Sequence, residues 1–313
     1  MKAQAIFITG RGRTEIRDIE APDPRADEVQ ARTLANGICM GEVSAFRGTE
    51  AAPLGPAGHE GIGVVTKVGR DVKRVREGDC VATFQWSTVV NLSASSVSVF
   101  SKPPADPAAF IAEPASCAVT AWYSYGIIPG DRVLVLGAGY MGLLNIQLLG
   151  QSPLSALAAA DVRADNLTLA GEYGATELIN SATPQGKARL DELKQKPFDL
   201  VVECAGAAET VKRAGELTRA GGRLAIFAWH HEPRTVDMGI WHMRGLRVLN
   251  SAPMIGADWA IHPFQRAIDL LERGVFDQRK LITHRHPFGD AQKALEEASV
   301  RAPGYRKGVL LFP

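Results

Sequence analysis

The pattern of apolar and polar positions divides the chain into two parts, with the change between residues 115 and 131. In the first part, the apolar runs are short and closely spaced, as in residues 62–68 and 80–84. Turn residues such as Glu77-Gly78-Asp79 separate them. Runs of this length and spacing are typical of β-strands. Many short strands with few helices predict a barrel-like or sandwich unit for this part of the chain.

From Asp131 onward, strand-like and helix-like runs alternate, which predicts a parallel sheet with helices on both faces. We expect strands at 132–136, 154–162, 176–180, 198–204, 223–229 and 246–250, and helices at 143–149, 165–175 and 207–217. Two more helices, 260–274 and 291–300, and a closing strand, 308–312, complete the chain. A chain of 313 residues is long for one core, so we expect an α/β protein with two domains.

Charge and cysteine content narrow the class of protein. The net charge is +1, so the chain lacks the basic excess of a nucleic-acid-binding protein. No apolar run approaches the ~20 residues of a membrane span, and the N-terminus lacks the apolar core of a signal peptide. The cysteines, at positions 39, 80, 117 and 204, form no C-x-x-C pair. This usage is typical of a reducing compartment, and we expect a cytoplasmic protein without nucleic-acid or membrane partners.

A glycine-rich run after the strand expected at 132–136 indicates a dinucleotide site. The run Gly137-Ala138-Gly139-Tyr140-Met141-Gly142 has the spacing G-x-G-x-x-G between a strand and a helix. There, glycines allow a tight turn, close approach of the backbone to a pyrophosphate and close helix–strand packing. Asp161 ends the next strand, about 20 residues on, where a carboxylate accepts from the ribose hydroxyls of NAD and repels the 2′-phosphate of NADP. The alternative is a plain turn with Asp161 as a helix cap. We assign Arg163 to the same site but do not expect it alone to restore NADP binding.

Cys39 and the adjacent pair His59 and Glu60 indicate a metal site in the first part of the chain. Thiolate, imidazole and carboxylate are the ligand types of catalytic zinc, where three protein groups bind and one position stays open. Neighbours in a strand point to opposite faces, so both members of the pair can reach one metal only where the backbone turns. The alternative is a surface His-Glu pair and a core cysteine.

Together these features resemble the zinc-dependent medium-chain alcohol and polyol dehydrogenases. The resemblance implies a GroES-like catalytic domain at 1–120 and 256–313 around a Rossmann NAD-binding domain at 121–255. It also implies NAD-dependent oxidation of a secondary alcohol, most plausibly a polyol, cyclitol or sugar, at one zinc ion per chain. The matching segments lie in family order: 37–39, 58–65, 68–69, 78–81, Glu113-Pro114, 137–142 with Asp161, and 203–206.

The resemblance also assigns individual residues. Cys39, His59 and Glu60 match the family's zinc ligands, and Glu113 matches a Glu-Pro motif near zinc, as a ligand directly or through water. Cys117 is the alternative further ligand. Thr120 is expected to pack against the nicotinamide ring. No cysteine occurs between residues 81 and 90, where many family members carry a lobe that binds a structural zinc, so this lobe is absent.

Two positions near the ligand cysteine depart from the family pattern. Gly41 replaces a serine or threonine that starts a proton relay, and Glu42 replaces an aspartate. We expect Ser44 or His231 to take the proton instead, because a hydroxyl can donate and accept and an imidazole titrates near neutral pH. We expect Glu42 to orient His59, as carboxylates often do for zinc-bound histidines.

Two other functions remain open at this point: a zinc-free NADPH reductase of the same superfamily, and a non-catalytic dinucleotide-binding protein that keeps the fold. Cys39, the His59-Glu60 pair and Asp161 argue against the first, whereas Gly41 and Glu42 leave room for the second. The strand expected at 246–250 is apolar and lies at a sheet edge, which is a liability unless it is paired. With the family resemblance, this edge predicts a homodimer or homotetramer.

Overall fold

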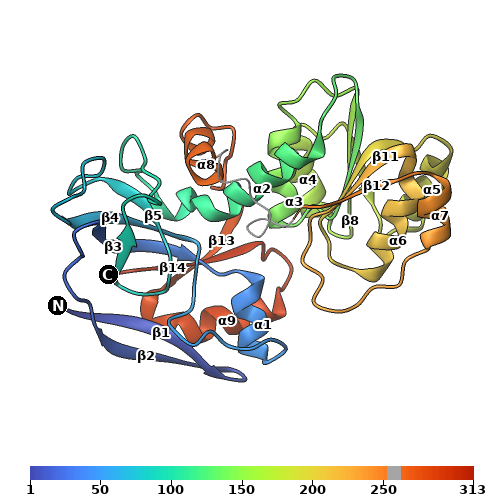
Figure 1. The fold of residues 1–313 in the computed structure, drawn as a ribbon. Coiled ribbons are helices and arrows are strands. Elements are labelled where there is room, and N and C mark those ends of the chain that lie inside the picture. The colour runs from blue at the N-terminus through green and yellow to red at the C-terminus, as the bar shows by residue number, and fades with distance from the viewer. Residues whose placement is uncertain (252–261) are drawn as a thin grey trace. The chain divides into compact units, whose positions relative to one another are not determined.

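The structure, a computed structural model, describes residues 1–251 and 262–313. The chain forms two compact units, Met1–Ala115 with Phe264–Pro313 (unit 1) and Ser116–Pro263 (unit 2). Figure 1 shows the elements of both. The unit boundary at Ala115 falls inside helix α2 (Ala112–Tyr125), a few residues before the expected boundary at 120. The other expected boundary, at residue 256, lies outside the described residues.

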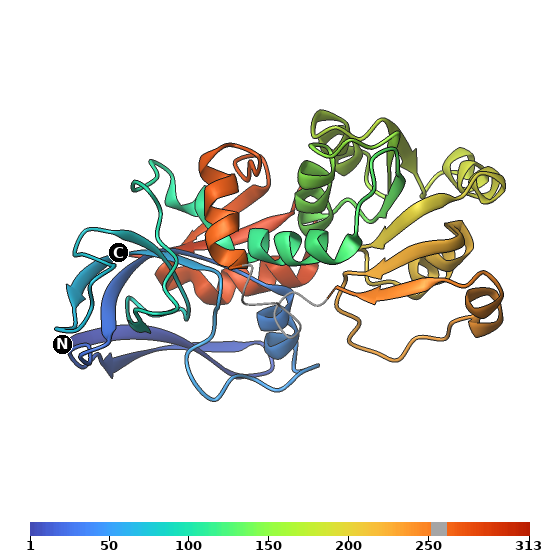
Figure 2. The ribbon, with the colours of Figure 1, turned by 45° about the horizontal axis from the view of Figure 1, so that its top comes forward.

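Unit 1 is built on β-strands, in agreement with the short apolar runs of its sequence. Its larger sheet has the order β13-β14-β3-β4-β5, with β6 also paired to β3, and β1 and β2 form a separate antiparallel ribbon. Antiparallel pairing of β14 with β3 brings the C-terminal strand into the middle of the sheet (Figure 2). The strands are β1 (Lys2–Gly10), β2 (Arg13–Glu20), β3 (Glu28–Gly37), β4 (Gly61–Val68), β5 (Cys80–Thr83), β6 (Val89–Ser93), β13 (Ile282–Pro287) and β14 (Lys307–Leu311).

Two apolar clusters hold unit 1 together. One contains buried residues of β1, α1 and α9, including Ile6, Phe46 and Leu295. The other is a set of valines from β3, β4, β5 and β6 and their connecting loops, such as Val29 and Val65. β-branched side chains suit such a pleated interior. The helices of this unit are α1 (Met40–Arg47), η1 (Pro107–Phe110), α8 (Pro263–Glu272), η4 (Phe288–Asp290) and α9 (Ala291–Val300), besides the start of α2.

Unit 2 confirms the predicted parallel sheet. Its strands run in the order β12-β11-β10-β7-β8-β9, and every adjacent pair is parallel. This is the doubly wound order of dinucleotide-binding folds. Successive strands are added on one side of the first strand, β7, and then on its other side, so the strand order reverses between β7 and β10. The strands are β7 (Arg132–Leu136), β8 (Ala156–Asp161), β9 (Glu177–Asn180), β10 (Phe198–Glu203), β11 (Thr218–Ile226) and β12 (Arg247–Asn250).

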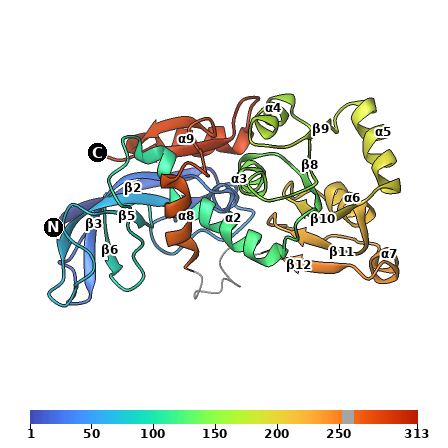
Figure 3. The same cartoon turned by 90° about the horizontal axis from the view of Figure 1, so that it is seen from above.

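Helices cover both faces of this sheet (Figure 3). Leu134 and Leu136 of β7 share a core with Leu190 and Leu217, which lie on α5 and α6. Val133 and Val135 alternate with them, so they point to the other face, and both are buried. The helices are α3 (Tyr140–Leu149), α4 (Ala164–Glu172), α5 (Pro184–Glu192), η2 (Leu193–Gln195), α6 (Ala208–Leu217) and α7 (Met238–Met243), besides the rest of α2.

The helices of the described ranges 1–251 and 262–313 are too short or too polar to cross a membrane.

Candidate active site

Five side chains with metal-ligating atoms converge in unit 1. The ligand atoms of His59, Glu60 and Glu113 all lie within 4.8 Å of one another. Those of Cys39, Glu42 and His59 form a second group with the same spread, so His59 belongs to both. The four predicted ligands therefore lie in two groups that share His59, and Glu42 belongs to the group of Cys39.

Three separate segments supply these side chains. Cys39 follows β3 and is the N-cap residue of α1, with extended backbone angles (φ −86°, ψ 159°). His59 and Glu60 immediately precede β4, and Glu113 lies in the first turn of α2. The group is thus formed where the end of one strand, the start of its antiparallel neighbour and a helix start meet.

The backbone before His59 turns rather than continuing as a strand. Gly58 has a φ of +92°, in the left-handed region that residues with a side chain rarely adopt. A Cβ atom at Gly58 would also come within 2.1 Å of the Trp86 ring. This turn allows the adjacent His59 and Glu60 side chains to serve one site, which a regular strand would prevent.

Glu42 connects the helix start to the imidazole of His59. Its Oε1 lies 2.8 Å from His59 Nδ1, and its Oε2 accepts the backbone N–H of Cys39 at 3.0 Å. The second bond satisfies one of the free N–H groups at the start of α1. One carboxylate therefore fixes both the ring of His59 and the backbone of Cys39, and the predicted contact between Glu42 and His59 is present.

A buried lysine that the sequence analysis missed pairs with Glu60. Lys307 Nζ donates to Glu60 Oε1 at 2.7 Å and lies 2.5 Å from Oε2, and the two side chains are only 6% and 2% exposed. Burial by itself would lower the pKa of Lys307, but attraction to Glu60 and Cys39 outweighs it and raises that pKa. Lys307 therefore stays charged. A lysine that begins a short apolar strand usually faces solvent, so the sequence carries no local signal of this pair.

The backbone at Gly37 leaves room for the paired carboxylate. A Cβ atom on Gly37 would come within 1.9 Å of Glu60 Oε2 and within 3.0 Å of Ile111. Glu60 Oε2 is itself buried and accepts no properly aligned hydrogen bond from the described residues. This oxygen, which could serve as a metal ligand, lies in a space that only a glycine at position 37 leaves open.

Cys39 and His59 carry protons that a metal ion must displace. Burial is the largest effect on the Cys39 thiol and raises its pKa; the hydrogen bond to His59 acts in the opposite direction, and the carboxylates of Glu60 and Glu42 raise the pKa further. Burial would lower the pKa of His59, but hydrogen bonds to Cys39 and Glu42 and the nearby carboxylates raise it to about 12. Metals bind thiolate and neutral imidazole, so metal binding here releases protons and strengthens with pH.

The donor set fits zinc. Sulfur, imidazole nitrogen and carboxylate oxygen are its protein ligands, and three of them leave one position open in a catalytic site. His59 with Glu60 and Glu113 supplies nitrogen and oxygen ligands within one group, and Cys39, which shares the other group with His59, would add the sulfur, with Glu42 orienting the imidazole. Cys117, the alternative ligand, belongs to the other unit, where it is buried in α2.

In unit 2, the glycine run forms the turn between β7 and α3, at the carboxyl end of the sheet. Tyr140 and Met141 begin α3, which starts with Gly139 as its N-cap residue. A Cβ atom on Gly142 would come within 1.9 Å of the Gly137 carbonyl oxygen, so the helix packs against the turn as closely as predicted. The turn lies beside the point where the strand order reverses, which is where such folds bind nucleotides.

Asp161 stands at the end of β8 and faces this turn. Its Oδ2 accepts the Ala138 N–H at 2.6 Å, and its Oδ1 accepts the Arg163 N–H at 2.8 Å. The carboxylate therefore joins the glycine turn to the start of α4. Arg163 is the N-cap residue of α4, and its guanidinium pairs with Asp165.

A buried polar network that the sequence analysis missed links the ends of β10 and β11. His230 Nε2 lies 2.9 Å from Glu203 Oε2, and Arg234 Nε donates to His230 Nδ1 at 3.1 Å. Arginine can only donate, so Nδ1 is the acceptor and the ring donates from Nε2 to the carboxylate. His230 thereby links the carboxylate of Glu203 to the guanidinium of Arg234. The other oxygen of Glu203 accepts from Ala205 N–H, Gly206 N–H and the Thr210 hydroxyl.

The remaining predicted residues lie as follows. His231 is exposed and stacks on Trp229, with ring centroids 5.5 Å apart and 10° between the planes. Thr120 is buried in α2, and its hydroxyl donates to the Ser116 carbonyl at 3.0 Å. Ser44 is buried in α1, and its hydroxyl makes no hydrogen bond to the described side chains of the metal-ligating group. The proton-relay roles of Ser44 and His231 stay predictions.

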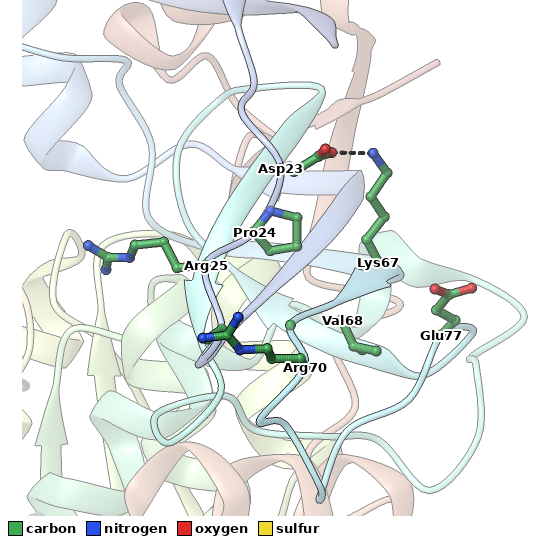
Figure 4. A pocket seen from close by; sticks show the side chains of 9 residues that line it. Asp23, Pro24, Arg25, Lys67, Val68, Arg70 and Glu77 are labelled. Atoms are coloured by element: carbon green, nitrogen blue, oxygen red, sulfur yellow. Dashed lines mark hydrogen bonds and ion pairs between the residues drawn. The ribbon is translucent and has the colours of Figure 1, made fainter.

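An open surface hollow of about 660 Å³ in unit 1 contains none of the predicted site residues (Figure 4). Its lining carries charges of both signs, and Lys67 is paired with Asp23 at 2.5 Å. The hollow therefore offers neither a set of metal-ligating atoms nor a field of one sign.

Two family models match the chain. The alcohol dehydrogenase GroES-like domain matches residues 25–99, and the zinc-binding dehydrogenase model matches residues 141–273. The first match lies within unit 1, and the second covers most of unit 2.

Other dehydrogenases and dehydrogenase-like proteins resemble the chain over nearly its whole length. Human sorbitol dehydrogenase is 27% identical, over 93% of this chain and 91% of that protein. A zinc-type alcohol dehydrogenase-like protein of Escherichia coli K12, YdjJ, is 25% identical over 99% of both. The solved structure of an alcohol dehydrogenase, rspB, from Escherichia coli CFT073 in complex with NADH has a TM-score of 0.86 and 25% identity, over 99% of each chain.

We expect Glu42→Ala to weaken zinc binding about 10–100-fold, because the imidazole of His59 loses the carboxylate that orients it. Glu42→Gln keeps one acceptor oxygen, enough for one of the two contacts, and should lose less than Glu42→Ala. Titration of zinc against a competing chelator measures the affinities. Thr183→Ala, which removes the side-chain cap of α5 in the other unit, is the control for loss of a helix cap alone. Unchanged zinc affinity in Glu42→Ala would contradict the orienting role.

We expect Lys307→Met to destabilise the zinc-free protein by about 3–5 kcal/mol, because Glu60 would be left as an unpaired buried charge. The double variant Lys307→Met, Glu60→Gln should regain most of this loss. Urea unfolding in the presence of chelator, followed by circular dichroism, measures the difference. A single variant as stable as the parent protein would show that Glu60 is not held as a buried charge by Lys307.

Proposed function

Because the chain belongs to the medium-chain dehydrogenase/reductase family, we propose that it is a zinc- and NAD-dependent oxidoreductase that oxidises a secondary alcohol group of a polyol, cyclitol or sugar. The observation that carries the proposal is the presence in unit 1 of two metal-ligating groups that share His59, one with Cys39 and the other with Glu60 and Glu113. The glycine turn and Asp161 at the strand ends of unit 2 supply the second requirement, a nucleotide site.

Each residue of the metal-ligating group has a defined task in this proposal. When bound, zinc supplies Lewis acidity at the substrate hydroxyl, and the nicotinamide supplies the hydride acceptor. Cys39 and His59 hold the ion, together with Glu60 or Glu113. Glu42 keeps His59 in the orientation that binds, and Lys307 neutralises Glu60 so that the carboxylate can stay buried.

The preference for NAD rests on Asp161. Its carboxylate lies at the end of β8, where the ribose of a bound dinucleotide is recognised, and a 2′-phosphate there would face a like charge. Gly137, Gly139, Tyr140, Met141 and Gly142 would line the pyrophosphate side, and Thr120 the nicotinamide side.

The substrate class rests on the metal-ligating group and on similarity. Glu113 adds a second carboxylate to His59 and Glu60, in a Glu-Pro motif that polyol dehydrogenases share. Human sorbitol dehydrogenase, which matches over most of both chains, points to the same class. We therefore propose a substrate with neighbouring hydroxyl groups.

Purified protein should contain close to one zinc per chain and should reduce NAD with at least one member of a panel of polyols, cyclitols and sugars. Cys39→Ser should lose both zinc and turnover, because a hydroxyl is a poor zinc ligand at neutral pH. Cys80→Ser, at a buried cysteine outside the group, is the matched control and should retain zinc. Metal analysis and NADH absorbance give the readings. Metal-independent turnover with NADPH would instead identify a zinc-free reductase, and zinc-free protein with no turnover would favour a non-catalytic role.

We also propose that the protein is a homodimer or homotetramer that pairs through β12, an edge strand of the described sheet in unit 2. Val248 on this strand is 38% exposed, and an unpaired apolar edge favours association. Light scattering should report an oligomer at micromolar concentration, and Val248→Lys should shift it toward monomer. Leu178→Lys, on the opposite edge strand β9, is the matched control and should leave the oligomer intact. A monomeric parent protein would refute the proposal.

A further inference from the structure

The turn that follows β8 carries two carboxylates and one guanidinium within five positions: Asp161, Arg163 and Asp165. Arg163 is the N-cap residue of α4, and Asp165 lies in the first turn of the helix. The three side chains thus occupy the strand end at which the proposed function places the adenosine ribose of the cofactor.

The guanidinium of Arg163 is engaged by Asp165 through two hydrogen bonds. Arg163 Nε donates to Asp165 Oδ1 at 3.2 Å, and Nη2 donates to Oδ2 at 2.9 Å. A fork of this kind is also how a guanidinium binds a phosphate, with two parallel N–H groups. The atoms of Arg163 that would recognise a 2′-phosphate are therefore the atoms that hold Asp165.

The backbone of Arg163 is held separately from its side chain. Its N–H group donates to Asp161 Oδ1 at 2.8 Å, and Asp161 Oδ2 accepts from Ala138 in the glycine turn. Arg163 is therefore fixed next to the carboxylate expected to bind the ribose, whatever its guanidinium does. A small rotation of the side chain would suffice to move the guanidinium from one partner to another.

The exposure of the pair makes such an exchange feasible. The side chains of Arg163 and Asp165 are 26% and 46% exposed, and ion pairs this exposed contribute only about 0–1 kcal/mol. The ion pair alone is therefore too weak to keep a phosphate from the guanidinium. The negative charge of Asp165 beside it also repels the phosphate. Asp165 acts twice, as the partner of Arg163 and as a like charge toward a phosphate.

We propose that Asp165 is a specificity-determining residue that selects NAD over NADP by occupying the guanidinium of Arg163. The inference rests on the proposed function for the location of the ribose. It adds a second carboxylate to Asp161, and it explains how a chain with an arginine at this strand end discriminates against a 2′-phosphate. Removing Asp165 releases an arginine that is already in place.

The test is direct binding of NADH and NADPH, followed by cofactor fluorescence, for Asp165→Ala, Arg163→Gln and the double variant. We expect Asp165→Ala to bind NADPH about tenfold more tightly, as one charge-assisted hydrogen bond allows, and to bind NADH as the parent does. The double variant should lose the gain. Asp191→Ala removes an exposed, ion-paired carboxylate elsewhere in unit 2 and should change neither affinity.

The outcomes separate the inference from the proposed function. Unchanged NADPH affinity in Asp165→Ala would overturn the inference, and so would a gain that persists in the double variant, because Arg163 would then play no part. Both results leave NADH binding, and with it the proposed function, in place. A parent protein that binds neither cofactor would overturn the proposed function and the inference together.

Discussion

The ion pair of Glu60 and Lys307 is the interaction on which the arrangement of unit 1 depends. Removing two charges from water costs several kcal/mol for each ion, and only close pairing in good geometry offsets that cost. The partners are 247 positions apart in the chain, so neither can be buried until β14 has paired with β3. That pairing sets Val309 opposite Gly37 and lets Ile38 donate to the Gly308 carbonyl at 3.0 Å. The C-terminal strand β14 therefore supports the metal-ligating group through Lys307, although it contributes no ligand itself.

The charges around His59 explain why the group holds a cation of some kind. Glu42, Glu60 and Glu113 place carboxylate oxygens close to the imidazole, and Glu60 is also paired with Lys307. Without a metal ion, the raised pKa of His59 shows that a proton fills part of this role. A proton and a metal ion compete for the same imidazole nitrogen. His59 can therefore be strongly basic without a metal ion and still serve as a metal ligand. This gathering of carboxylates favours a cation over a neutral occupant.

The local sequence pattern was sufficient to predict the alternation of strands and helices in unit 2. Each buried strand is one contiguous apolar run, and each helix that packs on the sheet has its own apolar period. The spacing of the glycine motif also predicted the turn that Asp161 contacts. The contact of Glu42 with His59 was predicted from the family resemblance, because carboxylates often orient zinc-bound histidines. Helix α5 was missed because only Gly186 and Leu190 of its residues are buried, which leaves almost no apolar period. Lys307 and the Glu203–His230–Arg234 network were missed for another reason. Their partners are set by which strands pair, and no periodicity within a segment records that.

The two sites use the same electrostatic principle with opposite results. At the metal-ligating group, three carboxylates lie close to one imidazole, the pKa of which is raised to about 12, so these surroundings favour a positive charge. At the end of β8, the guanidinium of Arg163 is balanced by Asp165, and Asp161 is satisfied by backbone N–H groups that carry no net charge. A 2′-phosphate would bring a charge of about −2 to that turn, whereas a ribose hydroxyl brings none and can donate to Asp161. At each proposed site, the net charge of the surrounding protein groups determines which ligand is accepted, more than the identity of any single residue does.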